Sequence, residues 1–547
     1  MLNVNAIQYQ VAEWSYRSRS IYEDPFHDLD LDAVITDEQG QTWTVPAYWA
    51  GGNEWKVRFS PPSEGRYRIC TNCSDASNRE LHGVEGVLEA SSQTESTNRL
   101  LRHGPIRVGD SGRHFEHEDG TPFLWLADTW YTCLSRRMTY PGRLEELVED
   151  RAGKGFSVVE IGIGLGPETP AFDERDENEA GYCWEERFAR IRPAYFDEAD
   201  RKIQYFVESG LAPCIVGAWG YYLLWMGTER MKRHWRYLIA RYGAYPVFWC
   251  LAGECNMPFY GTRQPQRGLD KSLLLREWTQ VAAYIRQTDP FRRPLTAHSN
   301  AFHSSRSQLE DGSLLDFELP QAGHGDTGRY NELHLAARHY IDIIQAQPTV
   351  PVISAEAFYE GIMGRNYADV QRFLFWSSLL SGSAGHTYGT IAVAVSNIEN
   401  EPFGTHPSGT RWDDLIWEQA IHLPGAAHVG AGKRILGRFE WWRLEPSQFR
   451  IEPAAGPSEA FNPYCAWIPG ETILIYTPIL LTPWNDPVRL MGLEHGILYR
   501  AQFIDPRNGR SYPIGDVCAD EQGEWTLPVP PIMQDWVVVL DLQPQIA

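Results

Sequence analysis

Eight short apolar segments alternate with helical patterns in the middle of the chain, and this alternation restricts the fold more than any other feature. The apolar segments cover residues 123–128, 157–163, 212–218, 247–252, 294–298, 316–320, 352–355 and 384–388. Helical periodicity separates most of them, over residues 144–154, 196–208, 229–242, 273–288 and 368–380. Eight strand–helix alternations over roughly 300 residues predict an α/β fold of the (β/α)8 TIM barrel type, which needs about 250 residues.

The chain of 547 residues is too long for one compact core, and the flanks of the predicted barrel have a different pattern. Residues 42–49 and 54–59 alternate apolar and polar side chains between turn-forming clusters, which is typical of an Ig-like β-sandwich. A Ser/Thr-rich connector follows at 91–97, and β patterns return at 472–477 and 535–541. We therefore predict three domains: an N-terminal β-sandwich over 1–100, the barrel over 101–432, and a C-terminal β-sandwich over 433–547.

Charge and cysteine content exclude some functions and favour one compartment. The net charge of −22 and the pI near 5.2 argue against a nucleic-acid partner, since phosphate binding relies on basic patches. No stretch is long and apolar enough to predict a membrane span, and residues 1–10 lack a basic segment followed by an apolar one. The nine cysteines, an odd number, are typical of reduced thiols, so we expect a cytoplasmic protein.

Two of the predicted strands end on a glutamate. The fourth reads Pro246-Val-Phe-Trp-Cys-Leu-Ala-Gly-Glu254, and the seventh reads Pro351-Val-Ile-Ser-Ala-Glu356. The carboxyl ends of barrel strands form the rim that carries the chemistry. A carboxylate closing an apolar strand is costly to desolvate, so it is usually paired, liganded or catalytic. Two carboxylates facing each other across a rim are the apparatus of glycoside hydrolysis, and we expect Glu254 and Glu356 to be the catalytic pair.

Polar or aromatic residues follow nearly every predicted strand, as a sugar site with many hydroxyl partners and flat apolar faces requires. The candidate substrate-binding residues are Asp128, Trp130, Tyr131, Trp219, Tyr221, Asn256, His298, Gln321, His324, Tyr359, His386 and Tyr388. Asp128 is expected to bind a substrate hydroxyl. Among the other acids, Glu160 is expected to be a buried structural carboxylate, Glu318 to have a partner in the core, and Glu360 to lie at the rim. No ligand-spaced metal motif or dinucleotide fingerprint stands out, so we predict neither a metal nor a cofactor.

Several of these segments resemble a known family. Residues 122–130, Gln321-Ala-Gly-His324, Glu356 with its neighbours and Gly385-His-Thr-Tyr-Gly389 resemble the apiosidase-like barrels of glycoside hydrolase family 140. The N-terminal segment is similar to the Ig-like module that often precedes such barrels. The C-terminal segment, with Asp505-Pro-Arg-Asn-Gly509, resembles the collagen-binding-like sandwich that often follows them. The resemblance thus covers nearly the whole chain.

The resemblance implies that Glu254 is the acid/base and Glu356 the nucleophile. Two departures concern the substrate. Gly253 stands where many related retaining barrels have the asparagine that binds the sugar 2-hydroxyl, and Asn256 is a candidate substitute. The related apiosidases also use aspartate as the acid, where this chain has glutamate, so specificity for apiose is not carried over.

The sequence thus predicts a cytoplasmic, retaining, exo-acting glycoside hydrolase that cleaves a small oligosaccharide or glycoside. Its expected partner is a carbohydrate substrate, without nucleic acid or membrane, and association into a homo-oligomer stays open. A catalytically idle carbohydrate-binding barrel and a transglycosidase are the alternatives. Two opposed acids argue against the idle barrel, because a binding protein has no need for them.

Overall fold

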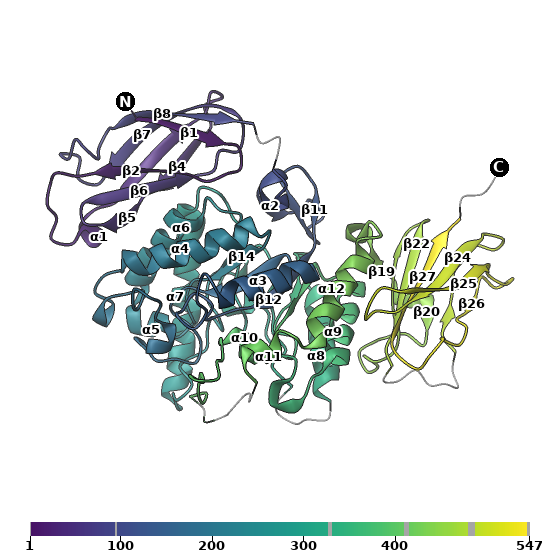
Figure 1. The fold of residues 1–547 in the computed structure, drawn as a ribbon. Helices are drawn as coiled ribbons and strands as arrows, with labels where there is room; N and C mark the ends of the chain where they lie inside the picture. The colour runs from purple at the N-terminus through teal and green to yellow at the C-terminus, as the bar shows by residue number, and fades with distance from the viewer. Residues whose placement is uncertain are drawn as a thin grey trace.

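The computed structural model describes residues 2–92, 96–325, 331–407, 409, 415–479 and 487–543. A β-sandwich, a central α/β barrel and a second β-sandwich follow one another along the chain, and the two sandwiches flank the barrel (Figure 1). Residues 93–95 of the predicted connector lie outside the described residues. Within the described ranges, no helix combines the length and the apolar character needed to cross a bilayer.

The central sheet is parallel and closes on itself. Its strand order is β16-β15-β14-β13-β12-β18-β17. The strands are β12 (Trp125–Thr129), β13 (Val158–Gly162), β14 (Ala212–Val216), β15 (Phe248–Cys250), β16 (Leu295–Thr296), β17 (Ile353–Ser354) and β18 (Gly385–Tyr388). Residues 318 and 319 fill the gap between β16 and β17, because Leu319 bridges to His298 and Glu318 bridges to Val352. This segment is the predicted sixth strand, and the (β/α)8 barrel is confirmed.

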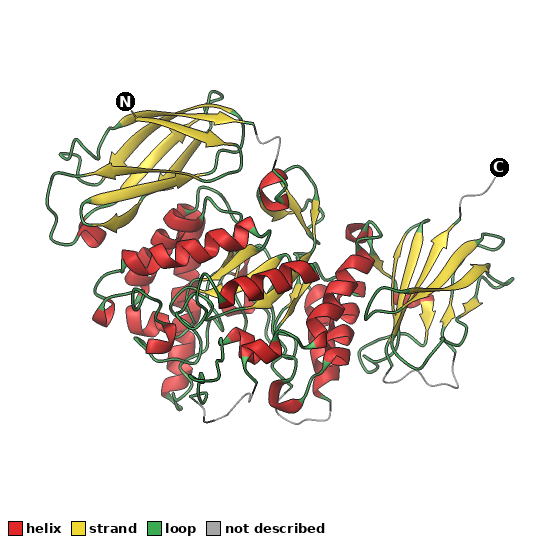
Figure 2. Ribbon diagram, in the orientation of Figure 1, coloured by secondary structure: helices red, strands yellow, loops and turns green. Residues whose placement is uncertain are grey.

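Helices surround this sheet (Figure 2). The main ones are α3 (Arg143–Lys154), α4 (Pro193–Glu208), α6 (Thr228–Tyr242), α7 (Gln266–Thr288), α8 (Glu332–Ile344), α9 (Ala368–Leu380) and α12 (Pro424–Leu436). The sequence patterns did not predict α8 or α12. Helix α12 is rich in small residues because it packs closely: a Cβ on Gly430 would lie 2.1 Å from the Lys154 carbonyl oxygen, and one on Gly432 would lie 2.5 Å from the Phe375 ring. The predicted domain boundary at residue 432 falls inside this helix.

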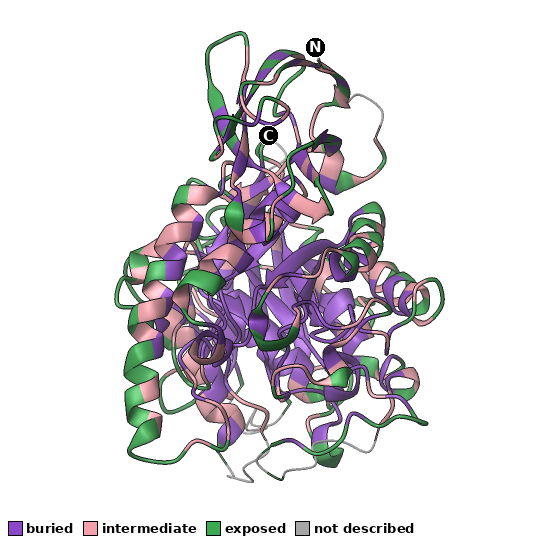
Figure 3. Ribbon diagram, turned by 90° about the vertical axis from the view of Figure 1, so that its left-hand side faces the viewer, coloured by how far each residue is buried: buried purple, intermediate pink, exposed green. Residues whose placement is uncertain are grey.

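The base of the barrel is closed by the segment that leads into it. Strands β9 (Ile106–Val108), β10 (Phe115–His117) and β11 (Pro122–Phe123) form a small antiparallel sheet. The Phe115 ring lies 5.2 Å from that of Phe248 and 5.1 Å from that of Phe317. Phe115 is fully buried, and Figure 3 shows buried residues throughout the centre of the molecule. The barrel interior is therefore a packed core and not a channel.

The N-terminal sandwich pairs the sheet β1-β8-β7-β3-β4 with the sheet β2-β6-β5. Its strands are β1 (Leu2–Ile7), β2 (Ala12–Arg17), β3 (Leu31–Thr36), β4 (Thr42–Pro46), β5 (Tyr48–Gly51), β6 (Glu54–Phe59), β7 (Gly65–Cys73) and β8 (Glu85–Ser91). Strand β2 shows the expected alternation of buried and exposed side chains. Arg58 ties this sandwich to the barrel, since it donates to Asp200 Oδ2 at 2.5 Å and to the Arg241 carbonyl at 2.8 Å.

The C-terminal sandwich pairs the sheet β19-β21-β22-β27-β24-β25 with the sheet β20-β23-β26. Its strands are β19 (Glu445–Pro446), β20 (Ile451–Glu452), β21 (Tyr464–Ile468), β22 (Thr472–Thr477), β23 (Arg489–Leu490), β24 (Tyr499–Ile504), β25 (Ser511–Val517), β26 (Trp525–Thr526) and β27 (Trp536–Leu542). It packs on α9, where the rings of Trp376 and Tyr476 stack with centroids 6.1 Å apart. Arg372 of α9 also forms a two-pronged ion pair with Asp535, at 2.8 and 2.9 Å.

Candidate active site

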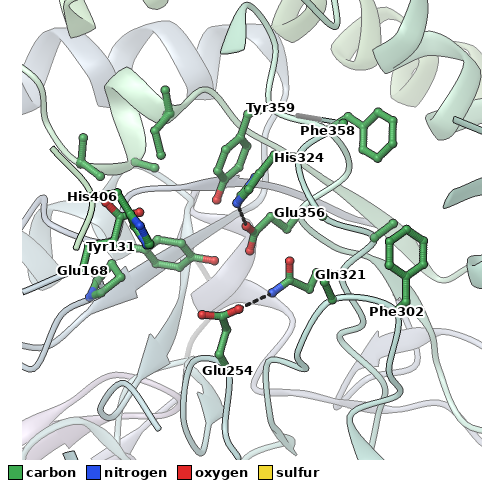
Figure 4. Close-up of a pocket in the computed structure, with 18 of the residues that line it drawn as sticks. Tyr131, Glu168, Glu254, Phe302, Gln321, His324, Glu356, Phe358, Tyr359 and His406 are labelled. Carbon is green, nitrogen blue, oxygen red and sulfur yellow. Dashed lines mark hydrogen bonds and ion pairs between the residues drawn. The ribbon is translucent and has the colours of Figure 1, made fainter. Parts of the chain in front are cut away.

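A pocket of about 290 Å³ lies where the barrel strands meet their following loops (Figure 4). Glu254 and Glu356, the two glutamates predicted to be catalytic, both line this pocket. The predicted substrate-binding residues that also line it are Tyr131, Trp219, Gln321, His324 and Tyr359. In Figure 4 the side chains of Glu254 and Glu356 reach into the same space from opposite sides.

Two histidines hold the Glu356 carboxylate. His298 Nε2 lies 2.9 Å from Oε2, and His324 Nε2 lies 3.2 Å from Oε1. Burial raises the pKa of Glu356, but the two histidines more than offset this and leave the pKa below its usual value. Burial disfavours the His298 cation, yet the hydrogen bond and the charge of Glu356 hold the pKa of His298 above its usual value. Glu356 is therefore stabilised as an anion.

Glu254 has a different environment. Its Oε1 accepts a hydrogen bond from Gln321 Nε2 at 3.1 Å, and its Oε2 accepts one from Trp219 Nε1 at 3.3 Å. Burial, and then the negative charge of Glu356, raise the pKa of Glu254 despite these donors. One carboxyl of the pair is thus driven towards the ionised form and the other towards the protonated form.

Both glutamates lie at strained points of the backbone. Glu254 has φ of 44° and Glu356 has φ of 42°, which is the left-handed region that residues with side chains rarely adopt. Glu254 lies four residues after the end of β15 and Glu356 two residues after the end of β17, so each turn aims its side chain across the mouth of the barrel. Strain of this kind, worth about 1–3 kcal/mol per residue, concentrates at functional sites.

Trp219 explains the glycine that precedes Glu254. A Cβ on Gly253 would lie 2.3 Å from the Trp219 ring, so the indole fills the space a side chain would take. The residue suggested as a substitute, Asn256, accepts a hydrogen bond from Asn300 Nδ2 at 2.6 Å and does not line the pocket. The Asn256 side-chain oxygen is therefore already paired, and the residue lies outside the pocket lining.

Several other predicted side chains also point away from the pocket. Asp128 is fully buried in an ion pair with Arg151 Nε at 2.6 Å, and it accepts a hydrogen bond from Trp130 Nε1 at 3.0 Å. It cannot meet a substrate hydroxyl from there. The Tyr221 hydroxyl donates to the Gly166 carbonyl at 3.2 Å and is also buried.

The alternation of side chains along β18 accounts for two more displaced residues. Thr387 points into the barrel and donates to Glu160 Oε1 at 2.7 Å. Its neighbours His386 and Tyr388 consequently face the outer helices. His386 Nδ1 pairs with Ser354 Oγ at 2.8 Å, and the Tyr388 hydroxyl donates to Glu360 Oε2 at 2.6 Å.

The three acids that were not predicted to be catalytic are all buried, and their positions agree with the sequence predictions only in part. Glu160 is fully buried inside the barrel, as expected, and burial raises the pKa of Glu160 to about 7. Glu318 accepts from the backbone N–H of Ser305 at 2.5 Å, so its partner is backbone. Glu360 is buried and accepts from the backbone N–H of Gly425 at 2.9 Å, so the expected position at the rim is wrong.

Comparison with known proteins identifies the family. The profile of the apiosidase-like catalytic domain matches residues 109–443. The chain belongs to the apiosidase-like family. It is a glycoside hydrolase, and its substrate is a carbohydrate. A domain of unknown function, DUF5060, matches residues 5–74 within the N-terminal sandwich, and the comparison with curated proteins gives no match.

Solved structures share the fold of this apiosidase-like enzyme. A glycoside hydrolase that is 21% identical matches 80% of this chain and 97% of its own, with a TM-score of 0.65. A glycoside hydrolase of family 5 from Bacteroides vulgatus ATCC 8482 is 20% identical and matches 80% of this chain and 93% of its own, with a TM-score of 0.66. A further structure from the same organism, 16% identical with a TM-score of 0.69, matches 99% of this chain and 100% of its own.

The apiosidase-like enzyme also has pocket residues that sequence reasoning missed. Five lie on loops beyond the strand ends, and Glu332 begins helix α8: Glu168, Tyr260, Phe302, Glu332, Phe358 and His406. The rings of Tyr260 and His406 meet edge to face at 4.3 Å, although the two residues are far apart in sequence. The rule that barrel sites are built from the loops after each strand could have indicated these segments, but not the individual residues. Within the described ranges, no group of three or more acidic, histidine or cysteine side chains is arranged to hold a metal ion.

Proposed function

We propose that the chain is a retaining, exo-acting glycosidase in which Glu356 is the nucleophile and Glu254 the acid/base. The opposite pKa shifts of the two carboxyls in one pocket carry this proposal. Glu356 is held as an anion by His298 and His324, as a nucleophile must be. Glu254 favours the protonated form, as an acid that protonates the leaving oxygen must.

The mechanism follows from these two states. The Glu356 carboxylate attacks the anomeric carbon while Glu254 gives its proton to the departing oxygen, which breaks the glycosidic bond. Glu254 is then an anion, and the donors Gln321 and Trp219 stabilise it. In the second step Glu254 takes a proton from a water molecule, which attacks the anomeric carbon and releases Glu356.

The pocket supports the exo-acting part of the proposal. Loops after many of the barrel strands surround it, and its volume of about 290 Å³ suits the end of a chain better than the middle. Tyr131, Trp219, Gln321, His324 and Tyr359 are the proposed substrate-binding residues. The nine cysteines, all free thiols, support a cytoplasmic location.

Two variants test the assignment of roles. Glu356→Gln should abolish turnover of every substrate in a panel of aryl glycosides. Glu254→Ala should lower kcat by about 10²–10⁴-fold for poor leaving groups and much less for good ones, which need little protonation. Added azide should restore the rate of Glu254→Ala on good leaving groups.

Glu229→Gln is a suitable control, because the Glu229 side chain is 84% exposed on α6, outside the pocket. Near-normal activity in both catalytic variants would refute the proposed pair. Binding of sugars by the wild-type protein without any turnover would instead favour the idle carbohydrate-binding barrel, and products built onto added acceptors would favour a transglycosidase.

The stereochemistry of the first product tests retention separately. Two displacements at the anomeric carbon restore its configuration, so the first-formed sugar should keep the anomeric configuration of the substrate. Proton NMR of the anomeric signal, recorded before mutarotation, measures this. Initial appearance of the opposite anomer would recast Glu356 as a general base that activates water.

A further inference from the structure

The pocket has two chemically different sides. Phe302 and Phe358 lie on one side of the two glutamates, and Tyr131, Glu168 and His406 lie on the other (Figure 4). The first side is built by loops that follow β16 and β17. The second is built by loops that follow β12, β13 and β18, which are neighbours in the sheet. The first side thus presents aromatic rings, and the second presents hydrogen-bonding groups beside the apolar side chains of Ile391, Ala394 and Val395.

Phe302 lies at the mouth of the pocket, on its aromatic side. It remains 45% exposed, and its backbone has φ of 60°, in the left-handed region. Its backbone N–H donates to the Gln321 carbonyl at 3.0 Å, and the edge of its ring meets His339 at 5.5 Å. Backbone strain of this kind concentrates at binding and catalytic sites, which favours a role for Phe302 in binding.

The neighbouring loop packs its glycines against the two rings: it covers Phe358, which is buried, and leaves Phe302 half-exposed. A Cβ on Gly325 would lie 2.9 Å from the Phe358 ring, so a side chain there would collide with it. Gly323 would place a Cβ 4.0 Å from Phe302, and both glycines have positive φ. Leu335 and Ala322 extend the apolar surface, while Glu332 also lines this side.

The two sides suit the two parts of a glycoside. The sugar that is cleaved needs several hydrogen-bond partners, which the Tyr131, Glu168 and His406 side supplies. The leaving group departs first, while the sugar is still bonded to Glu356, so it belongs at the exposed mouth beside Phe302. Gln321 links the two, because its side chain donates to the acid Glu254 and its carbonyl accepts from Phe302.

We propose, building on the glycosidase function above, that Phe302 forms a leaving-group subsite for a group with a flat apolar face. Such a face is offered by a pyranose ring or by an aromatic aglycone. Stacking of this kind should contribute about 3- to 10-fold in kcat/KM, which corresponds to about 0.7–1.4 kcal/mol.

The test compares three substrates that carry the same sugar, chosen as the one turned over fastest in the aryl glycoside panel. They are its 4-nitrophenyl glycoside, its methyl glycoside and a disaccharide. Phe302→Ala should lower kcat/KM about 3- to 10-fold for the aryl glycoside, the disaccharide or both, and leave the methyl glycoside unchanged. Loss confined to the aryl glycoside identifies an aromatic aglycone, and loss confined to the disaccharide identifies a sugar ring.

Two further variants keep the test decisive. Phe302→Tyr keeps the ring and should retain the wild-type preference. Phe449→Ala removes a phenylalanine that is 73% exposed outside the pocket, and should change none of the three substrates. An equal loss on all three substrates in Phe302→Ala would overturn the subsite while leaving the glycosidase function intact. Absence of wild-type turnover on every glycoside would refute that function and the subsite with it.

Discussion

Glu254 and Glu356 are the same residue type in the same pocket, yet their neighbours drive them to opposite protonation states. Glu356 faces two imidazoles, whereas Glu254 faces a neutral amide, a neutral indole and the charge of Glu356 itself. Neutral donors favour the anion less than a cation does, so burial prevails at Glu254 and not at Glu356. The direction of each shift therefore follows from the partners and not from the depth of the site.

The pH dependence of kcat/KM should report these two shifts. Activity needs Glu356 ionised and Glu254 protonated, so the rate should fall at low pH through the pKa of Glu356 and at high pH through the pKa of Glu254. The charge of His324 lowers the pKa of Glu356. His324→Gln should therefore move the acidic limb to higher pH. A full pH profile of kcat/KM measures it.

Trp219→Phe tests the basic limb of the pH profile, in the same way as His324→Gln tests the acidic limb. The indole N–H lowers the pKa of Glu254, so its loss should raise that pKa and move the basic limb to higher pH. A basic limb that stays in place in Trp219→Phe would assign it to another group, for which the buried His298 is the first candidate.

At the scale of the elements, the sequence predicted the barrel strands because they are buried on both faces. Strands β12, β13 and β14 are buried at every position, which produces the continuous apolar runs that were recognised. Burial on both faces also means that the sequence pattern cannot predict the direction in which a single side chain points. Where both faces are apolar, the pattern does not say which residue faces inward, so Asp128 and Tyr388 were placed in the pocket although they face the outer helices.

The glutamates were found because they end strands, where position alone determines direction. Phe302 and His406 were missed because they lie on loops whose course depends on tertiary contacts. Helix α12 escaped prediction for a third reason: Gly430 and Gly432 weaken its helical signal, but close packing against Lys154 and Phe375 requires them.

At the scale of the whole molecule, the C-terminal sandwich is held by a buried ion pair. Arg372 and Asp535 have side chains that are 9% and 3% exposed, and Asp535 also accepts from the Tyr476 hydroxyl at 3.1 Å. Removing one partner of a buried pair leaves the other charge unpaired, at a cost of about 3–5 kcal/mol. The contact between barrel and sandwich should depend strongly on it.

Asp535→Ala should therefore lower the free energy of unfolding by about 3–5 kcal/mol, measured by urea denaturation with tryptophan fluorescence. Replacing both partners, as in Arg372→Met with Asp535→Leu, should recover much of the loss. Asp516→Ala is the control, since it breaks the exposed pair with Arg500 and should cost about 0–1 kcal/mol. Equal effects of Asp535→Ala and Asp516→Ala would show that the buried pair does not hold the modules together.

The small sheet of β9, β10 and β11 under the barrel determines how substrate and products can reach and leave the pocket. Phe115 packs against Phe248 and Phe317 and closes the base, so substrate and products do not pass through the barrel interior and use the mouth at the strand ends. A released sugar leaves through the same mouth by which the next substrate arrives, so product release must precede substrate binding. In the proposed orientation the cleaved sugar lies deeper than the leaving group, so the leaving group departs from the pocket first.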